Sequence, residues 1–391
     1  MNIRIDELNI KNFVGIGSGN IEVNPNNPND IVNVIGIFGA NGTGKTGTLN
    51  VIKVIQKLLK GEDIPINLTD IKNDTTITVK FTFSSFEETF SIFYSVKYNR
   101  KEIISEHLYK DKELLLGYCN GTYTGKLIKE LPPSFNSMVK TDKTKLTSYL
   151  FNTFVLVYSE MIDFDKFNYM IMLNSFAKNK MLFIDAEEVY NGRLVVNIGK
   201  LVGTSDEFFN LIKPLSLERE SVELIRASFI KINPLLKEFV NRRLELVKVS
   251  EGMYMVGVYN QDKFVLMEFE SLGIKRLILY MYSFMLLRND RSICLCIDEI
   301  DSGIFEPLLR ELVLSIKTVY AGQLWFTAHN FELVGALNSN DVIFTTLDSK
   351  DRFMRLDTVE VLHDIYEKIG EGFYGNFDEA EFDYLMRGSY V

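Results

Sequence analysis

The most chemically informative part of this sequence is the stretch Gly39-Ala-Asn-Gly-Thr-Gly-Lys-Thr46. It fits the pattern of a phosphate-binding loop, which is Gly, any four residues, Gly, Lys and then Ser or Thr. The glycines let successive backbone amides point at phosphate oxygens, and a helix that follows adds its N-terminus. We expect the Lys45 ammonium to reach the β and γ phosphates and the Thr46 hydroxyl to ligate Mg²⁺. The residues predicted to contact the nucleotide here are Gly39, Ala40, Asn41, Gly42, Thr43, Gly44, Lys45, Thr46 and Gly47.

Two acidic residues, Asp298 and Glu299, follow an apolar run from Ile293 to Ile297. At the end of a buried strand beside the strand of the phosphate loop, Asp298 would hold Mg²⁺ through water. Glu299 would suit a general base for the attacking water. Alone, an Asp-Glu pair is more readily explained as a solvated strand end. The apolar run before it and the phosphate loop upstream favour the catalytic interpretation.

A histidine, His329, follows a second apolar stretch, Leu324-Trp-Phe-Thr-Ala328. A lone histidine after a strand is usually structural. Its position one strand beyond Asp298 predicts instead that the ring contacts the γ-phosphate or the attacking water. We therefore predict Lys45, Glu299 and His329 as catalytic residues, with Thr46 and Asp298 as ligands of Mg²⁺.

The segment Ser271-Leu-Gly-Ile-Lys275, called the signature segment below, lies between these motifs. On its own it predicts a turn before a helix, with Ser271 as the N-cap. A hydroxyl and the amide of Gly273 at a helix N-terminus also form an anion site. Within one subunit this site would face away from the phosphate loop. We expect it to cover a γ-phosphate that a second subunit holds.

Length and composition favour a globular protein with one large domain and a lobe, or two domains. The chain has 391 residues, of which 46% are hydrophobic and 24% charged. Its three cysteines, Cys119, Cys294 and Cys296, have no metal-ligand spacing and make no disulfide framework, so a reducing cytoplasm is expected. Residues 1–8 carry charges where a signal peptide would be apolar. The longest apolar run, residues 277–287, is too short for a membrane span and predicts a buried helix, so we expect no membrane partner.

The formal net charge of −9 argues against a generally basic surface for nucleic acid. One local cluster of lysines has two interpretations, a solvated loop or a patch that contacts phosphates. It consists of Lys126, Lys129, Lys140, Lys143 and Lys145, opposed by Glu130 and Asp142. The solvated loop is the more common case, and binding of nucleic acid through this patch stays open.

The pattern of elements places the motifs on a mixed α/β fold. We predict a strand over 2–10, a buried strand over 31–38 and a helix over 46–59. Period-two alternation predicts an antiparallel layer over 75–120, and residues 206–248 are expected to be mostly helical. Further segments are a buried strand over 154–158 and a hairpin over 254–269 that leads into the signature segment.

In these motifs and their order the chain resembles the ABC-type ATPase fold in its non-transporter branch, which includes SMC-like and OLD-like ATPases. More narrowly, it is similar to AAA-labelled ATPases of bacterial anti-phage and abortive-infection systems. The segments that carry this narrower resemblance are Asn12-Phe13, the phosphate loop, Ser271–Leu277, Asp298–Gly303, Thr327–Asn330 and Glu371–Gly375.

The resemblance implies an α/β P-loop fold of the ABC type, with a mixed central sheet, an antiparallel β layer and a helical insertion lobe. The expected boundaries are 1–120 and 251–391 for the two halves of the ATPase head, and 121–250 for a mainly helical lobe. The sequence departs from the family pattern at Leu272 and Ile274, where Gly and Gln or Glu are commoner, and at Phe305, where His or Asp is common. Ser159 or Glu160 is the best positional candidate for the Q-loop glutamine that the family carries.

The function that follows from this interpretation is Mg²⁺-dependent hydrolysis of ATP by a head-to-tail homodimer, or a higher homo-oligomer, in which ATP is sandwiched between subunits. The resemblance implies an ATPase or sensor component of an anti-phage system that controls a partner effector nuclease or toxin. Two alternatives remain. One is an SMC-like DNA repair ATPase, and the other is a slow nucleotide switch that scaffolds a partner.

Overall fold

The computed structural model describes residues 1–23, 32–70, 72–85, 87–130, 146–152, 168–184, 189–317 and 322–355. The chain divides into two compact units. Unit 1 comprises residues 1, 3–178 and 329–391, and unit 2 comprises residues 2 and 179–328.

Unit 1 is built around a seven-stranded sheet in the order β2-β1-β4-β5-β6-β7-β8. Its strands along the chain are β1 (Asn2–Phe13), β2 (Ile16–Glu22), β4 (Thr75–Ser84), β5 (Thr89–Tyr98), β6 (Ile103–Lys110), β7 (Glu113–Cys119) and β8 (Thr122–Thr124). The pair β1–β2 and the pairs from β4 to β8 are antiparallel. Every second side chain of β4 and β5 is buried, as the period-two sequence predicts. The predicted antiparallel layer is therefore confirmed.

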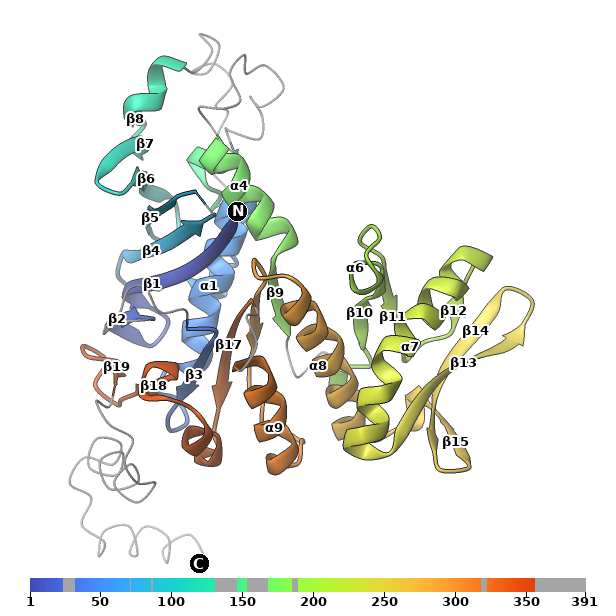
Figure 1. Ribbon diagram of the computed structural model, residues 1–391. Helices are drawn as coiled ribbons and strands as arrows, with labels where there is room; N and C mark the ends of the chain where they lie inside the picture. Colours follow the sequence, from blue (N-terminus) through green and yellow to red (C-terminus); the bar gives the residue numbers. More distant parts are fainter. Residues whose placement is uncertain are drawn as a thin grey trace, which may run out of the picture. The chain divides into compact units, whose positions relative to one another are not determined.

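Two helices, α1 (Lys45–Lys60) and α4 (Asn168–Asn179), lie beside this sheet (Figure 1). The apolar side chains of α1 are buried, and the helix ends at Gly61, whose φ of 75° allows its amide to bond back to Leu58. The two helices are joined by polar bonds: Gln56 donates to the Ala177 carbonyl at 3.0 Å, and Asn174 donates to the Leu59 carbonyl at 2.7 Å. The core of unit 1 thus fixes the helix that follows the phosphate loop.

A smaller group of strands in unit 1 carries the phosphate loop itself. β3 (Val34–Phe38) is fully buried and lies parallel to β18 (Val342–Thr345), which pairs with the short β19 (Phe353–Met354) in an antiparallel hairpin. The short 3-10 turns of this unit are η1 (Ile66–Leu68), η2 (Lys126–Glu130), η6 (Phe331–Ala336) and η7 (Ser339–Asp341). Because β3 is apolar on both faces, it reads as a continuous hydrophobic run, as the sequence predicts.

Unit 2 contains three parallel strands in the order β17-β16-β9, namely β9 (Met181–Ile184), β16 (Cys294–Ile297) and β17 (Gln323–Ala328). Helix α8 (Leu272–Asn289) precedes β16, and helix α9 (Glu306–Lys317) follows it. Side chains around most of α8 are buried from Leu277 to Leu287, which confirms the predicted buried helix. Cys294 and Cys296 are buried in β16 as predicted, and burial raises the pKa of the Cys296 thiol.

The remaining part of unit 2 is a lobe of short strands and one long helix. Its elements are β10 (Val195–Asn197), α6 (Ile198–Val202), β11 (Phe208–Asn210), β12 (Leu215–Ser216), α7 (Arg219–Val240), β13 (Arg242–Ser250), β14 (Met253–Asn260), β15 (Lys263–Leu266) and η5 (Met267–Phe269). The hairpin expected over 254–269 is confirmed by the antiparallel pair β14–β15.

The helical expectation for 206–248 is wrong at both ends, because residues 208–210, 215–216 and 242–250 are strands. In β13 the buried residues Leu244 and Leu246 alternate with more exposed neighbours and pair with β14 over eight register positions. Pairing with β14 is a tertiary interaction, and it overrides the helical propensity of the Arg, Leu, Glu and Lys residues here. None of the described helices is long and apolar enough to cross a membrane.

Candidate functional site

The phosphate loop follows β3 in unit 1 and is shaped by three glycines with positive φ. These are Gly39 at 153°, Gly42 at 77° and Gly44 at 93°. At Gly39 an added Cβ would lie 2.1 Å from Thr345 Oγ1, so no other residue fits without displacing β18. At Gly42 an added Cβ would meet no described atom within 4 Å. The loop is therefore tight against β18 at its start and open at its tip, where an anion would enter.

Two threonines, Thr43 and Thr345, hold the phosphate loop by hydrogen bonds. The Thr43 hydroxyl is 2.7 Å from the Ala40 carbonyl and 2.6 Å from the Thr345 hydroxyl, and Thr345 in turn donates to the Phe38 carbonyl at 3.1 Å. Both threonines are fully buried. Thr345 was not among the predicted site residues, because its partner Thr43 lies 302 residues away in the sequence.

Lys45 and His329, 284 residues apart, meet at this loop. The Lys45 ammonium donates to the Gly39 carbonyl at 2.7 Å and to the Ala40 carbonyl at 2.9 Å, and lies 3.4 Å from His329 Nδ1. The lysine is only 6% exposed. Thr46, Asn41 and Gly42 are exposed at the mouth of the loop. Within unit 1 the structure thus brings together Lys45, His329 and Thr46, which the sequence predicted to contact the nucleotide or Mg²⁺.

These residues fit a bound triphosphate and Mg²⁺ by their chemistry. Backbone amides of a positive-φ nest, the N-terminus of the sixteen-residue helix α1 and a lysine all favour an anion. A threonine hydroxyl is an oxygen ligand of the kind that Mg²⁺ prefers.

Unit 2 holds the two predicted acidic residues at the end of the buried strand β16. The Thr327 hydroxyl donates to Asp298 Oδ1 at 2.5 Å and accepts from the Glu299 amide at 2.8 Å. The Ile300 amide donates to the Thr327 carbonyl at 3.0 Å. Glu299 has a φ of 49°, which non-glycine residues seldom adopt. One threonine thus orients both acidic residues, and it is a further site residue for which the motifs alone predicted no role.

The signature segment lies in unit 2 at the start of α8. Ser271 is the N-cap, and its hydroxyl accepts from the Ile274 amide at 3.3 Å, as expected of an N-cap serine. This bond uses the oxygen as an acceptor, so the hydroxyl proton can be donated outward. At Gly273 an added Cβ would lie 2.5 Å from the Gly303 carbonyl oxygen. The first turn of α8 therefore touches the loop that follows Glu299.

Arg276 strengthens this contact. Its guanidinium donates to the Ser302 carbonyl and, at 2.7 Å, to the Ser302 hydroxyl, and the side chain is buried. Tyr280 lies one turn further along α8, and burial raises its pKa. The charge of Arg276 lowers this pKa, and the carboxylates of Asp301, Asp298 and Glu299 raise it further. Unit 2 therefore joins the signature segment and the two acidic residues into one packed group.

Several predicted positions lie outside the described residues. They are the strand over 154–158, the Q-loop candidates Ser159 and Glu160, three lysines of the basic cluster (Lys140, Lys143 and Lys145) and the segment Glu371–Gly375. Of the lysines that are described, Lys126 pairs with Glu113 at 3.0 Å and is mostly exposed. The two lysines of this cluster that are described, Lys126 and Lys129, are both exposed, which suits either interpretation.

Comparison with solved structures identifies the fold. The chain aligns with an SMC head bound to the C-terminal winged-helix domain of ScpA with a TM-score of 0.52 and 12% identity, covering 91% of this chain and 98% of that one. The fold is that of an SMC head. It confirms the predicted α/β fold of the ABC type.

Two further SMC heads align over similar lengths. The head domain from Thermotoga maritima is 13% identical, with 91% and 100% of the two chains covered and a TM-score of 0.43. The head domain from Pyrococcus furiosus, solved with an extended coiled coil and bound to the C-terminal domain of ScpA, is 14% identical, with 94% and 99% covered and a TM-score of 0.47. No family model matches the sequence, and no curated protein is similar to it.

Proposed function

We propose that this chain is a Mg²⁺-dependent ATPase. The observation that carries the proposal is the meeting of Lys45 and His329 at a glycine loop whose tip is open. Two distant segments place a cation and an imidazole where the terminal phosphate of a nucleotide would lie. An ordinary glycine turn requires neither residue.

Each predicted residue has a role in this proposal. The phosphate loop amides and Lys45 bind the triphosphate, and Thr46 and Asp298 hold Mg²⁺, which neutralises phosphate charge when bound. Glu299 accepts a proton from the attacking water, and His329 orients that water or the γ-phosphate by a hydrogen bond. Thr327 keeps Asp298 and Glu299 in position.

We propose further that the ATP-bound form is a head-to-tail dimer. In it, each ATP lies between Lys45 of one subunit and Ser271 of the other, and hydrolysis opens the sandwich. The support is the N-cap geometry of Ser271, whose hydroxyl proton and neighbouring amides are suited to a phosphate oxygen. A site of this kind completes the charge neutralisation that one phosphate loop begins.

For the biological role, we propose an ATPase or sensor component of an anti-phage system acting in the cytoplasm on an effector nuclease or toxin. The support is the motif resemblance described above. The SMC-like alternative, an ATPase for DNA repair, is favoured by the likeness to an SMC head. Neighbouring genes separate the two, because an adjacent nuclease or toxin reading frame is expected only for a defence system.

The substitution Glu299→Gln tests the ATPase proposal, with Lys45→Ala as its contrast. Glu299→Gln removes the base and leaves the phosphate contacts, so it should bind ATP, stop turning over and accumulate as a dimer in sedimentation. Lys45→Ala removes a contact made in both the ground and the transition state, so affinity and turnover should fall together.

Turnover by Glu299→Gln at the parent rate would show that Glu299 is not the base. Undiminished ATP affinity in Lys45→Ala would exclude the phosphate loop as the nucleotide site. If the parent protein binds ATP and dimerises but hydrolyses it at a negligible rate, the slow-switch alternative is correct instead.

A further inference from the structure

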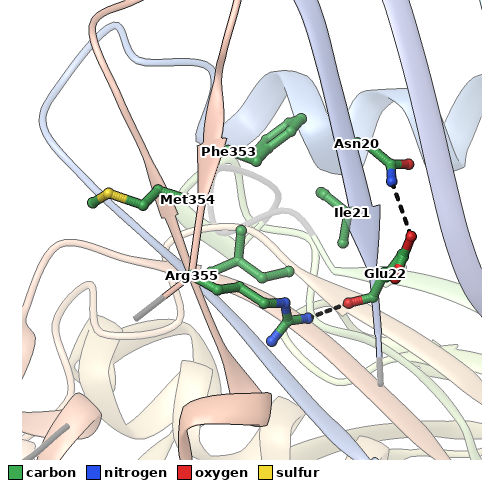
Figure 2. Close-up of a pocket in the computed structure, with 7 residues that line it drawn as sticks. Asn20, Ile21, Glu22, Phe353, Met354 and Arg355 are labelled. Carbon is green, nitrogen blue, oxygen red and sulfur yellow. Dashed lines mark hydrogen bonds between the residues drawn. The ribbon is translucent and has the colours of Figure 1, made fainter. Parts of the chain in front are cut away.

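The edge strands of this protein differ in whether their outward backbone groups are used. At the edge strand β2 in unit 1, the Ser18 amide donates to the Ser349 carbonyl at 2.8 Å, and the Arg352 amide donates to the Ser18 carbonyl at 3.2 Å. Arg355 donates to the Glu22 carbonyl at 2.5 Å, and Figure 2 shows these two residues beside a cavity of about 220 Å³. An uncovered edge is a template for another strand, and these contacts cover the edge of β2.

The nine-residue strand β13 in unit 2 is covered at only one point. It is the outer strand in the order β12-β14-β13, so β14 uses one of its two edges. On the other edge, Asn233 of α7 donates to the Leu244 carbonyl at 3.1 Å and accepts from the Leu244 amide at 2.7 Å. The backbone groups of Leu244 therefore point away from β14. This direction recurs at every second residue of an antiparallel strand, so the backbone groups of Leu246 and Lys248 also point outward.

Residues 246–248, called the open edge below, lack such a cover. Among the described residues, none hydrogen-bonds to the outward amides and carbonyls of Leu246 and Lys248. Ile230 precedes Asn233 on α7 by three residues, so the two side chains share a helix face. One residue joins α7 to β13, so the two elements run in opposite directions and Ile230 lies toward Leu246. Its side chain is 75% exposed. An unused backbone edge beside an exposed apolar side chain is suited to pairing with another strand.

A second copy of this chain fits the open edge, because the edge is complementary to itself. Rotation by 180° about an axis at Val247 would set Leu246 opposite the partner's Lys248, and Lys248 opposite the partner's Leu246. The outward amides and carbonyls of both residues would then enter one antiparallel ladder, while Leu244 keeps its bonds to Asn233. An axis at Leu246 would instead set Lys248 against the partner's Leu244, whose backbone groups Asn233 already binds.

The side chains on the opposite face of β13 also favour the axis at Val247. Val247 and Val249 alternate with the residues whose side chains face α7, so they point to the other side of the sheet. Val249 is 62% exposed. In the symmetric register Val247 faces the partner's Val247, and Val249 is its diagonal neighbour. Two valines from each copy would thus gather at the axis and bury part of this exposed apolar surface.

We propose that two copies of this chain associate through the open edge of β13, so that the sheet of one lobe continues into that of the other. The interface shares no residue with the phosphate loop or the signature segment. It therefore forms without nucleotide and does not rest on the proposed function. A copy that also enters the ATP sandwich would have two different neighbours, so ATP would link these dimers into larger assemblies.

Disulfide cross-linking of the full chain tests the register, in a Cys119→Ser background because Cys119 is exposed. Opposed residues of a non-hydrogen-bonded antiparallel pair have Cα atoms about 4.5 Å apart, which is within the range of a disulfide. Val247→Cys should therefore form a covalent dimer when the nucleotide-free protein is oxidised. Glu245→Cys is the matched control, because its two copies would lie about 13 Å apart along the strands and should not link.

A proline at Lys248 tests the backbone pairing. The Lys248 amide points away from β14, so Lys248→Pro removes no bond of the β13–β14 ladder but blocks the open edge. Self-association of the nucleotide-free protein, measured by sedimentation equilibrium, should weaken by at least about tenfold, which is 1.4 kcal/mol. Lys248→Ala keeps the amide and should self-associate like the parent. Thermal unfolding of each variant checks that the fold is retained.

Ser271→Arg separates this interface from the proposed ATP sandwich, because it should leave the nucleotide-free dimer intact. Loss of that dimer in Ser271→Arg would overturn the inference, since association would then run through the signature segment. A parent protein that is monomeric without nucleotide at every concentration tested would also overturn it. So would equal linking of Val247→Cys and Glu245→Cys, or parent-like association of Lys248→Pro.

Discussion

Thr327 connects the two acidic side chains that the proposal assigns to magnesium and water. It donates to Asp298 and accepts from the Glu299 amide. Glu299 has a left-handed backbone conformation, which costs a non-glycine residue about 1–3 kcal/mol and persists only with support from its surroundings. The hydrogen bond from the Glu299 amide to the Thr327 hydroxyl is one such support. The orientation of the proposed base therefore depends on a neutral hydroxyl.

Replacing this hydroxyl should therefore affect both stability and turnover. Thr327→Val keeps the volume but removes a donor and an acceptor, and it leaves the Glu299 amide without this bond. We expect a loss of about 1–3 kcal/mol in unfolding free energy. We also expect a fall in kcat of about tenfold to a hundredfold from the misplaced base. Urea unfolding and steady-state ATP turnover measure the two effects.

Thr327→Ser is the control, because it restores the hydroxyl and removes only a methyl group. It should retain most of the turnover. Parent-level kcat in Thr327→Val would mean that the threonine does not orient Glu299.

Residues whose roles come from local pattern were predictable, and residues whose roles come from distant contacts were not. Lys45 and Thr46 are defined by spacing within eight residues, and the N-cap role of Ser271 follows from the helix it precedes. Thr345 contacts Thr43 from 302 residues away, and no local pattern reports such a partner. The catalytic roles of Asp298, Glu299 and His329 stay predictions until turnover is measured.

Among the elements, the helical residues 149–152 are fixed to the sheet of unit 1 by one buried carboxylate. Glu106 on β6 accepts from the amides of Tyr149 at 2.8 Å and Leu150 at 3.1 Å, and from the hydroxyls of Tyr94 and Ser148. Its side chain is fully buried. Burial raises the pKa of Glu106, and the four hydrogen bonds act in the opposite direction.

Glu106→Gln tests this anchor. The glutamine side chain would place its NH₂ group, which is a donor, against hydroxyls or backbone amides that now donate to a carboxylate oxygen of Glu106. We expect a loss of about 2–3 kcal/mol in unfolding free energy, measured in urea. The exposed Glu102, four residues earlier, supplies the control, since Glu102→Gln should be close to neutral. An equally small effect at both positions would show that Glu106 does not fix residues 149–152.

Elements with one clear period were predicted correctly, whereas a change of period inside a segment was missed. The antiparallel strands β4 and β5, the apolar strand β16 and the buried helix α8 each follow a single pattern. Residues 242–250 alternate in Leu-Glu-Leu-Val-Lys-Val, but their charged residues also suit a helix. Pairing with β14, the next strand along the chain, decides between the two.

At the scale of the whole molecule, the predicted nucleotide residues divide between the two units. The phosphate loop and His329 belong to unit 1, and the signature segment, Asp298 and Glu299 belong to unit 2. In the proposed dimer, ATP contacts the phosphate loop of one subunit and the signature segment of the other. Hydrolysis would then depend on association, and a defect in the signature segment would act on the partner's nucleotide.

Ser271→Arg separates this composite site from a monomeric hydrolase. The substitution places a bulky cation where a partner's γ-phosphate would approach, while the phosphate loop of the same subunit keeps its residues. We expect near-normal ATP binding by the monomer and loss of ATP-driven dimerisation in sedimentation. Mixing it with Lys45→Ala should restore one intact composite site per heterodimer, with part of the activity if the two sites fire independently.

The most direct test of the central claim is the rate of ATP hydrolysis by Ser271→Arg alone. The proposed sandwich predicts a fall of at least ~100-fold, a barrier change of about 2.7 kcal/mol, in a protein that still binds ATP. Full activity of this variant would contradict the sandwich and leave a monomeric P-loop hydrolase as the better description.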